Sequence, residues 1–319
     1  MSCCCVIIVN YNSWEELRCC LDHLEKQTWR DFQVFVIDNA SNLSPPEGFI
    51  ERYSRATLIR SSVNLGFAGG NNLALGALSP CEWIALLNPD AFPDPDWLEQ
   101  LVETAKAHPD YAMFGSRQVI ADAPHLLDGE GDVYHVSGLV WRSRHGRSVS
   151  AGEQGPREIF SPCAAAALYR ADAFRHVGGF DEDFFCYVED VDLGFRLRLL
   201  GYKALFVPSA VVHHVGSATT GGGQSDFALY HGHRNLVWTY VKNMPGVLFW
   251  IFLPLHLLLN LVTLAIFAWR GKGPTVFRAK RDALRGLPKM RAKRRHIQRE
   301  RIVSAGQIWR ALDKGWKRR

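Results

Sequence analysis

The sequence predicts an α/β fold with a mainly parallel central sheet. Over residues 6–107, short apolar runs rich in β-branched residues alternate with segments of helical periodicity. Each apolar run also ends in polar residues. Strands that alternate with helices at this spacing form parallel sheets with helices on both faces, and such sheets bind ligands at the carboxyl ends of their strands.

The expected strands lie at 6–10, 32–37, 57–60 and 83–87, and the expected helices at 14–24, 71–78 and 96–107. Ser13, followed three residues later by Glu16, matches a capping box ahead of the first helix. Residues 115–160 are rich in glycine, arginine, serine and histidine, and we expect an irregular insertion or a hairpin over the site. Further helices are expected at 171–177 and 189–200, and a strand at 204–212.

The charge of the chain is unevenly distributed. The net charge is +5, but residues 270–319 hold 18 lysines and arginines against three acidic residues, a net charge of +15 that leaves −10 on residues 1–269. A strongly basic segment favours an anionic partner, either a membrane surface or a nucleic acid.

Residues 246–269, GVLFWIFLPLHLLLNLVTLAIFAW, carry no charge and are long enough to span a bilayer. Pro254, His256 and Asn260 are unusual in a membrane span, so three alternatives stay open. The segment is a single span, a helix lying on the membrane, or a buried helix pair broken at Pro254. Because the basic segment follows directly, anionic lipid is a better partner than nucleic acid, and the positive-inside tendency places that segment at the cytoplasmic face. We expect a globular domain at 1–243, an apolar membrane-associating segment at 244–270 and a basic cytoplasmic tail at 271–319.

The eight cysteines show no C-x-x-C spacing, and most stand in apolar runs. We expect them to be small core residues in a reducing compartment. The N-terminus has neither a basic region nor a cleavage site ahead of its first apolar run, so no secretory signal is expected.

Polar residues at the ends of the first strands are candidates for ligand contacts. Asn10 ends the first strand, and Asp38 ends the second, where a carboxylate can accept a base N–H or a ribose hydroxyl; Asp-Asn at a strand end is also common turn chemistry. The segment NLGFAGGNN, 64–72, places Gly66 and Gly70 between a strand and a helix, where backbone can approach an anionic ligand closely. Its spacing is neither G-x-G-x-x-G nor a P-loop, and a plain turn is the alternative.

Two further strand ends carry possible metal ligands. Asn88 and Asp90, in LLNPDA, point the same way in extended backbone and can hold a hard cation against a diphosphate; a proline turn is the alternative. His213 and His214, in VVHHVGS, alternate, so at most one faces the site. A lone histidine is more often structural unless Asp90 lies close to it.

The stretch FFCYVEDVDLGFRLRLLGYK, 184–203, places carboxylates among aromatic residues. Asp192 and Arg196 are four apart and can pair on one helix, which gives Asp192 a structural role. Glu189 and Asp190 begin the helix, where the helix dipole stabilises carboxylates. The alternative is that one of them acts as a base, which aromatic surroundings would make stronger.

In order, the segments VIIVNYN, VFVIDNAS, NLGFAGGNN, LLNPDA, GGFDEDFFCYVEDVDLGFR, VVHHVGS and HRN resemble those of family 2 glycosyltransferases, and most of all their rhamnosyltransferase-like branch. The resemblance implies a GT-A-type nucleotide-diphospho-sugar transferase fold and inversion at the anomeric carbon. It implies Asp190 as catalytic base, with Glu189 second, and Asp90, Asn88 and His214 as ligands of Mg²⁺ or Mn²⁺. The implied nucleotide and donor contacts are Asn10, Asp38, Asn64, Gly66, Gly70 and Asn72.

The expected function is transfer of a sugar from a nucleotide-diphosphate donor to a lipid-linked or cell-envelope glycan at the cytoplasmic membrane face, by a peripheral or single-span protein. dTDP-rhamnose is the leading donor, with UDP and GDP sugars open. The sequence departs from the family pattern at two places. Asn88 stands at the first DxD position, and Asn42-Leu43-Ser44 stands after DNAS, where the family often has a further aspartate. A nucleotidyltransferase would need a Gly-rich basic loop in place of VNYNSWEEL. A catalytically inactive, membrane-tethered carbohydrate-binding scaffold is the remaining alternative.

Overall fold

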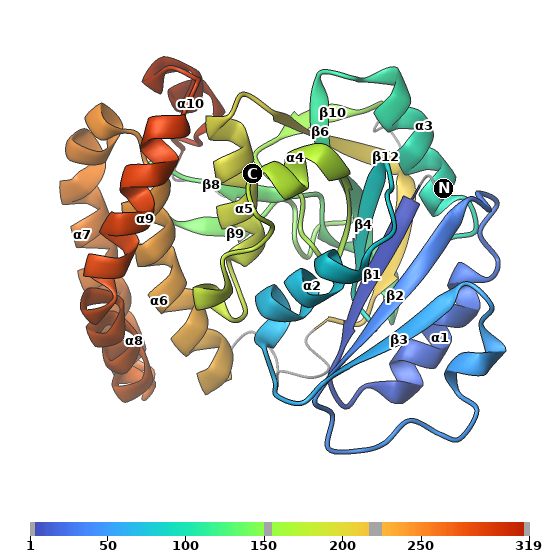
Figure 1. The fold of residues 1–319 in the computed structure, drawn as a ribbon. Helices are drawn as coiled ribbons and strands as arrows, with labels where there is room; N and C mark the ends of the chain where they lie inside the picture. Colours follow the sequence, from blue (N-terminus) through green and yellow to red (C-terminus); the bar gives the residue numbers. More distant parts are fainter. Residues whose placement is uncertain (1–3, 150–154, 217–224, 316–319) are drawn as a thin grey trace.

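A ten-stranded sheet forms the centre of the computed structural model, which describes residues 4–149, 155–216 and 225–315 (Figure 1). Its main path runs β10-β12-β6-β11-β4-β1-β2-β3, with β5 paired to β12 and β7 to β6. The strands are β1 (Cys4–Asn10), β2 (Phe32–Asn39), β3 (Ala56–Ser61), β4 (Trp83–Leu87), β5 (Ala91–Pro93), β6 (Tyr111–Ile120), β7 (Ala123–Gly129), β10 (Arg157–Ile159), β11 (Ala166–Arg170) and β12 (Lys203–His214).

The central sheet is mainly parallel, as the sequence predicts. Strands β3, β2, β1 and β4 are parallel neighbours, and β6 and β12 are parallel to each other, whereas β11 runs antiparallel between β4 and β6. Asn10 pairs with Asp38 in the register of β1 and β2, so the polar ends of these strands meet at one edge of the sheet.

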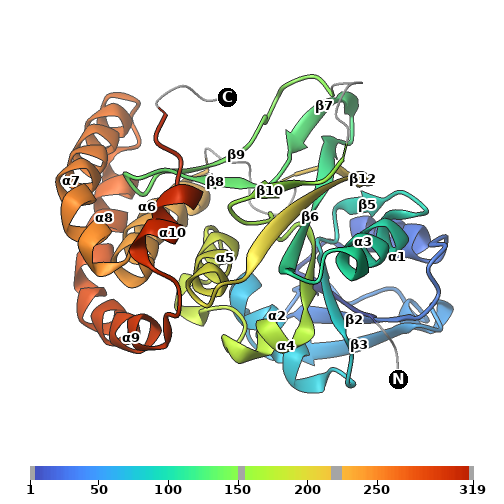
Figure 2. The same ribbon diagram turned by 90° about the horizontal axis from the view of Figure 1, so that it is seen from above.

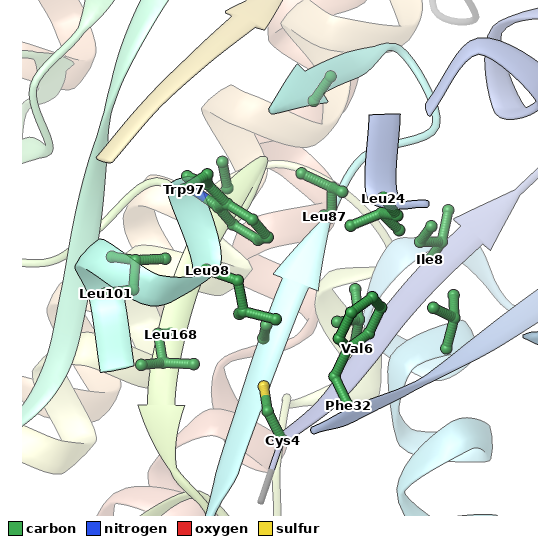
Figure 3. Close-up of a cluster of buried hydrophobic side chains, with 14 of the residues drawn as sticks. Cys4, Val6, Ile8, Leu24, Phe32, Leu87, Trp97, Leu98, Leu101 and Leu168 are labelled. Carbon is green, nitrogen blue, oxygen red and sulfur yellow. The ribbon is translucent and has the colours of Figure 1, made fainter. Parts of the chain in front are cut away.

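Helices cover both faces of the sheet (Figure 2). Val6 and Ile8 of β1 pack with α1 (Trp14–Leu24) and α3 (Trp97–Ala107), whereas Cys5 and Ile7 pack with α2 (Gly66–Ala77), α4 (Ala171–His176) and α5 (Glu189–Leu199). Figure 3 shows the first cluster, in which Trp97 lies among leucines from several elements. Burial on both faces explains why these strands are almost wholly apolar.

Two local predictions are wrong. Helix α2 begins at Gly66 rather than at 71, so most of the glycine-rich segment is helix and not loop. Ser13 is the N-cap of α1 but makes no side-chain capping hydrogen bond, and its hydroxyl instead donates to the carbonyl of Tyr11.

The segment at 115–160 contains the predicted hairpin. Strands β8 (Asp132–Tyr134) and β9 (Val140–Arg142) pair antiparallel as a separate two-stranded sheet. The first half of the segment continues β6 and turns back as β7. The seven described cysteines are all free thiols, in keeping with their predicted role as core residues.

The C-terminal helices form a layer at one end of the molecule (Figures 1 and 2). They are α6 (Asp226–Asn243), α7 (Gly246–Trp269), α8 (Gly273–Arg285), α9 (Leu287–Glu300) and α10 (Ala305–Ala311). Elsewhere in the chain, short 3₁₀ turns occur at Ile50–Arg52 and Glu182–Phe184. Helix α7 is long and apolar enough to cross a membrane, with a mean hydropathy of 2.2 in its most apolar window, of which 6% is buried. Pro254 does not break it into two helices.

Candidate active site

A cavity of about 360 Å³ opens at the carboxyl edge of the sheet. The ends of β1, β2 and β4 form its floor, the β8–β9 hairpin forms one wall, and the segment before α5 forms another. Predicted site residues that line it are Asn64, Gly66, Asn88, Asp90, Glu189, Asp190 and His214. The structure thus brings together residues that lie far apart in the chain.

His214 and Asp90 form a buried pair in this cavity. Nε2 of His214 lies 3.4 Å from Oδ1 of Asp90, and Nδ1 lies 2.7 Å from Oδ2 of Asp128. Burial disfavours the imidazolium, but hydrogen bonds to Asp128 and Asp90 outweigh it and raise the pKa of His214. A carboxylate that orients one ring nitrogen while the other points at an oxygen ligand is the usual setting of a metal-binding histidine, so these residues fit a divalent cation.

His213 points elsewhere, as alternation along β12 predicts. Its Nε2 lies 3.1 Å from Asp94, outside the cavity. The side chain of Asn88 lines the cavity beside Asp90, and the backbone N–H of Asn88 donates to the carbonyl of Ala165. Asn88 can therefore supply a neutral oxygen ligand next to the charged one.

Glu189 and Asp190 begin α5 and also line the cavity. Asp190 accepts hydrogen bonds from the backbone N–H of Ala164 at 3.1 Å and of Val191 at 2.8 Å. Burial raises the pKa of Asp190, although these donors and the charge of Arg142 oppose the shift. Burial and the neighbouring Asp190 also raise the pKa of Glu189 well above its usual value. A raised pKa makes each of these carboxylates a stronger base than an exposed carboxylate.

Asp192, the third acid of the stretch, has the structural role that the sequence predicts. Its carboxylate accepts from Nε of Arg196 at 2.9 Å and from Lys242 and Asn243 of α6. It is fully buried and faces away from the cavity.

The backbone before α5 is strained. Phe185, Tyr187 and Val188 have φ values of 64°, 67° and 68°, a left-handed conformation that costs non-glycine residues free energy. The amide of Asn235 donates to the carbonyls of Phe184, Cys186 and Tyr187, and Arg234 donates to that of Phe184. These two residues of the HRN segment fix the loop that presents Glu189 and Asp190.

Asn64 and Gly66 are held at the cavity by hydrogen bonds from the side chain of Asn39. The amide of Asn39 donates to the side chain of Asn64 at 3.0 Å and to the carbonyl of Gly66 at 3.1 Å. A Cβ on Gly66 would lie 2.4 Å from the carbonyl oxygen of Phe185. The glycine is therefore required for the approach of the 185 segment to α2, whatever it does for a ligand.

The remaining predicted donor contacts do not line the cavity. The Asn72 amide holds the backbone of Phe180, and a Cβ on Gly70 would meet Val9 at 2.7 Å, so both serve packing of α2. Asp38 accepts from the N–H of Ser41, the turn alternative noted above. Asn10 is fully buried behind the floor, and its amide has no hydrogen-bond partner among the described residues.

The sequence did not single out four residues of the site, namely Asp128, Asp132, Trp141 and Arg142. Asp132, Trp141 and Arg142 line the cavity from the hairpin, and Arg142 is ion-paired with Asp128. Burial and the nearby Asp190 raise the pKa of Asp132 well above its usual value. The only sequence signal for these residues was that charged residues occur in a segment expected to lie over the sheet edge. The spacing of those residues shows no periodicity that would have singled them out.

Similarity to known proteins identifies the family of this chain. Residues 5–178 match the family model described as glycosyl transferase family 2, which is more than half of the chain. The chain belongs to this family. Among curated relatives of this family 2 enzyme, an N-acetylglucosaminyl-diphospho-decaprenol L-rhamnosyltransferase of Mycobacterium tuberculosis is 28% identical over 71% of this chain and 80% of its own length. Rhamnosyltransferase WbbL of Escherichia coli is 27% identical over 64% of this chain and 80% of its own length.

Solved structures show the GT-A fold of this glycosyltransferase. GalNAc-T7 with UDP, GalNAc and Mn²⁺ superposes with a TM-score of 0.61 at 15% identity, over 75% of this chain and 47% of the other. The mannosyltransferase PcManGT from Pyrobaculum calidifontis, in complex with GDP-Man and Mn²⁺, gives a TM-score of 0.57 at 16% identity, over 97% of this chain and 87% of the other.

Proposed function

We propose that this family 2 glycosyltransferase is an inverting, metal-dependent enzyme with Asp190 as its catalytic base. The observation that carries the proposal is that Asp190 and the Asp90–His214 pair face one cavity at the carboxyl edge of the sheet. A direct displacement needs a base at one side of the reacting carbon and a charge clamp for the leaving group at the other. It needs no covalent nucleophile.

The reaction follows from these positions. Asp190 takes the proton of the acceptor hydroxyl while that oxygen forms a bond to the anomeric carbon. The bond from the anomeric carbon to the diphosphate oxygen breaks, and the nucleoside diphosphate leaves with the electron pair. One displacement on the face opposite the leaving group inverts the anomeric configuration.

Asp90 and His214, with Asn88 as a neutral neighbour, would hold Mg²⁺ or Mn²⁺. When bound, the cation would neutralise the charge that develops on the leaving diphosphate. Asp128 orients the His214 ring through Nδ1, and Arg142 holds Asp128 in turn. Asn64, Gly66 and Tyr11 line the adjoining part of the cavity and would contact the donor. Asp38, Asn10, Gly70 and Asn72 do not line it, so we assign them no direct donor contact.

The names of the relatives favour L-rhamnose as the transferred sugar, which supports dTDP-rhamnose as donor. The mycobacterial name also supports an acceptor carried on a lipid diphosphate. An acceptor of that kind places the reaction at a membrane, and we assign it to the cytoplasmic face, where nucleotide sugars are available. The apolar α7 and the basic residues of α8 in the segment that follows it would face anionic lipid there.

The test measures nucleoside diphosphate release from dTDP-, UDP- and GDP-sugars, with Mg²⁺ or Mn²⁺ and a membrane lipid extract. Wild type is compared with Asp190→Asn and with the matched control Asp172→Asn, an exposed carboxylate of α4 paired with Arg170. We expect release from one donor, lost in Asp190→Asn with donor binding retained, and unchanged in the control.

Equal release by wild type and Asp190→Asn would move the base elsewhere, with Glu189 next. A folded protein that binds no nucleotide sugar and no nucleoside diphosphate would refute the enzymatic proposal and favour the scaffold alternative.

A further inference from the structure

Helix α7 has two different faces. On one face His256 is buried, stacks on Tyr240 at a centroid distance of 4.0 Å and lies 2.7 Å from the carbonyl of Ser137. The opposite face is apolar and exposed, and its residues are Val247, Trp250, Ile251, Leu257, Leu258, Leu261, Val262, Ile266 and Trp269. One side of α7 is therefore committed to the protein, and the other forms an apolar stripe that no described residue covers.

The chain after α7 folds back and contacts the domain that precedes α7. Lys293 of α9 is ion-paired with Asp181 and Asp183, and the latter carboxylate also lies 2.6 Å from Nζ of Lys289. Arg294 donates to the carbonyls of Val241 and Met244 at 2.9 and 2.6 Å. Part of the basic segment thus neutralises acidic residues of the catalytic domain and packs against it.

Two more contacts extend this return. Nε1 of Trp238 on α6 donates to the carbonyl of Ala283 on α8 at 3.0 Å. Further along, Asp313 and the β8 residue Tyr134 share a backbone hydrogen bond of 2.9 Å. Residues 283–313 are therefore in contact with residues 134–244 at several independent points.

These contacts conflict with a transmembrane span. If α7 crossed the bilayer, α8, α9 and α10 would lie on the opposite side from the catalytic domain, and all of the contacts above would be lost. An arrangement with both α7 and α8 inside the hydrocarbon is also unfavourable. Arg278, Arg281 and Arg285 are exposed on α8, and each arginine would cost several kcal/mol at the bilayer centre. Length and hydropathy alone cannot reveal this conflict.

Helix α8 adds an amphipathic surface beside α7 (Figures 1 and 2). Phe277 and Leu284 are 59% and 63% exposed, and their spacing of seven puts them on the same side of the helix as Arg281 and Arg285. Apolar and arginine side chains on one face, with tryptophans near both ends of α7, are typical of helices that lie in the headgroup region of an anionic membrane.

We propose that this protein docks on an anionic bilayer surface through α7 and α8 lying in the plane of the membrane, without spanning it. The apolar stripe of α7 enters the interface, while α9 and α10 stay with the catalytic domain on the same side. This inference goes beyond the proposed function, since it does not depend on the donor, the acceptor or the chemistry.

The first test is the topology of the full chain in sealed, inside-out membrane vesicles from producing cells. Trypsin is added outside, the peptides are identified by mass spectrometry, and a parallel sample is washed with alkaline carbonate. We expect cleavage in both the catalytic domain and 281–313 from the same side, and release of the protein by carbonate. Protection of 281–313 while the domain is digested, with retention after carbonate, would establish a span and overturn the proposal.

The second test uses flotation of purified full-length protein with vesicles of phosphatidylcholine and phosphatidylglycerol. Leu261→Glu, on the α7 stripe, is compared with Leu43→Glu, because the two leucines are 66% and 64% exposed. We expect Leu261→Glu to lose about tenfold in vesicle affinity and Leu43→Glu to bind as wild type does, with binding weakened by salt and by omission of phosphatidylglycerol.

Two results of the second test would contradict the proposal. Unchanged binding of Leu261→Glu would show that the stripe does not touch lipid. A lipid-free dimer that dissociates in Leu261→Glu would assign the stripe to a second copy of this chain.

Discussion

The side-chain amide of Asn235 donates to the backbone carbonyl of Tyr187 over 2.7 Å, across 48 residues of sequence. The same nitrogen lies 2.9 Å from the carbonyl of Phe184 and 3.0 Å from that of Cys186. Tyr187 and its neighbour Val188 have positive φ, which costs about 1–3 kcal/mol per residue. Asn235 thus stabilises a strained turn that ends where Glu189 and Asp190 begin.

Replacing Asn235 with alanine should lower kcat more than it weakens donor binding. The substitution removes a donor to the carbonyls of Cys186 and Tyr187 and one of the donors to that of Phe184. Asp190, the proposed base, is then held less firmly, and we expect kcat to fall about tenfold or more. Unfolding in urea should show a loss of about 2 kcal/mol. Asn260→Ala is the control, because among the described residues that amide bonds only to His256, one turn earlier in its own helix. Equal kcat in both variants would exclude a positioning role for Asn235.

The pH dependence of kcat/KM should show an acidic limb above the usual carboxyl range. Burial raises the pKa of Asp190, and only the deprotonated form can take the acceptor proton. Activity should therefore rise with pH through this raised pKa and then level off. A limb at the ordinary aspartate pKa of about 4 would contradict the buried setting. The exposed Asp172→Asn control should leave the profile unchanged.

Glu189→Gln should stabilise the protein at neutral pH. The pKa of Glu189 is raised well above its model-compound value of 4.5 in the folded state, so the folded protein holds this proton more tightly than the unfolded chain. The resulting stability is complete below the unfolded pKa and is lost as pH rises through the folded pKa. The neutral glutamine has no such loss. Urea unfolding at pH 5 and pH 8 should show a stability gain in the variant that grows with pH; a gain that is constant with pH would refute the assignment.

The sheet and part of the site were predictable because their signals are local. β-Branched runs define β1, β2 and β4, and alternation along β12 places only one of His213 and His214 in the cavity. The pairing of Asp192 with Arg196 follows from their spacing of four.

The rest of the site depends on contacts that no local pattern encodes. Asp128 and Arg142 meet because β7 and the β8–β9 hairpin fold over the sheet edge, and their segment shows no periodicity. The amide of Asn72 bonds to the backbone of Phe180, 108 residues later in the chain, and does not line the cavity. The charges of 270–319 suggested a basic tail with an anionic partner, since sequence does not show that Lys293 meets Asp181.

Metal dependence should separate the two adjacent histidines. His214→Gln removes the ring nitrogen that faces Asp90, so the concentration of Mg²⁺ or Mn²⁺ for half-maximal activity should rise by well over tenfold, whereas His213→Gln should leave it unchanged. Asp128→Asn should raise it about 10- to 100-fold, because Asp128 only orients the ring. Identical metal titrations for the two histidine variants would remove His214 from the metal site.

Lys242 should be a major determinant of stability, and Lys289 should not. Lys242 is 1% exposed and joins Asp181 to Asp192, whose side chains are 7% and 0% exposed. Lys242→Met leaves these two carboxylates buried with less compensation, and breaking a buried pair costs about 3–5 kcal/mol. Lys289 is 64% exposed, and its partner Asp183 keeps Lys293, so Lys289→Met should cost under about 1 kcal/mol. Urea unfolding of both variants tests the difference. Equal small losses would show that the cluster joining α6 to the segment before Glu189 and Asp190 is dispensable.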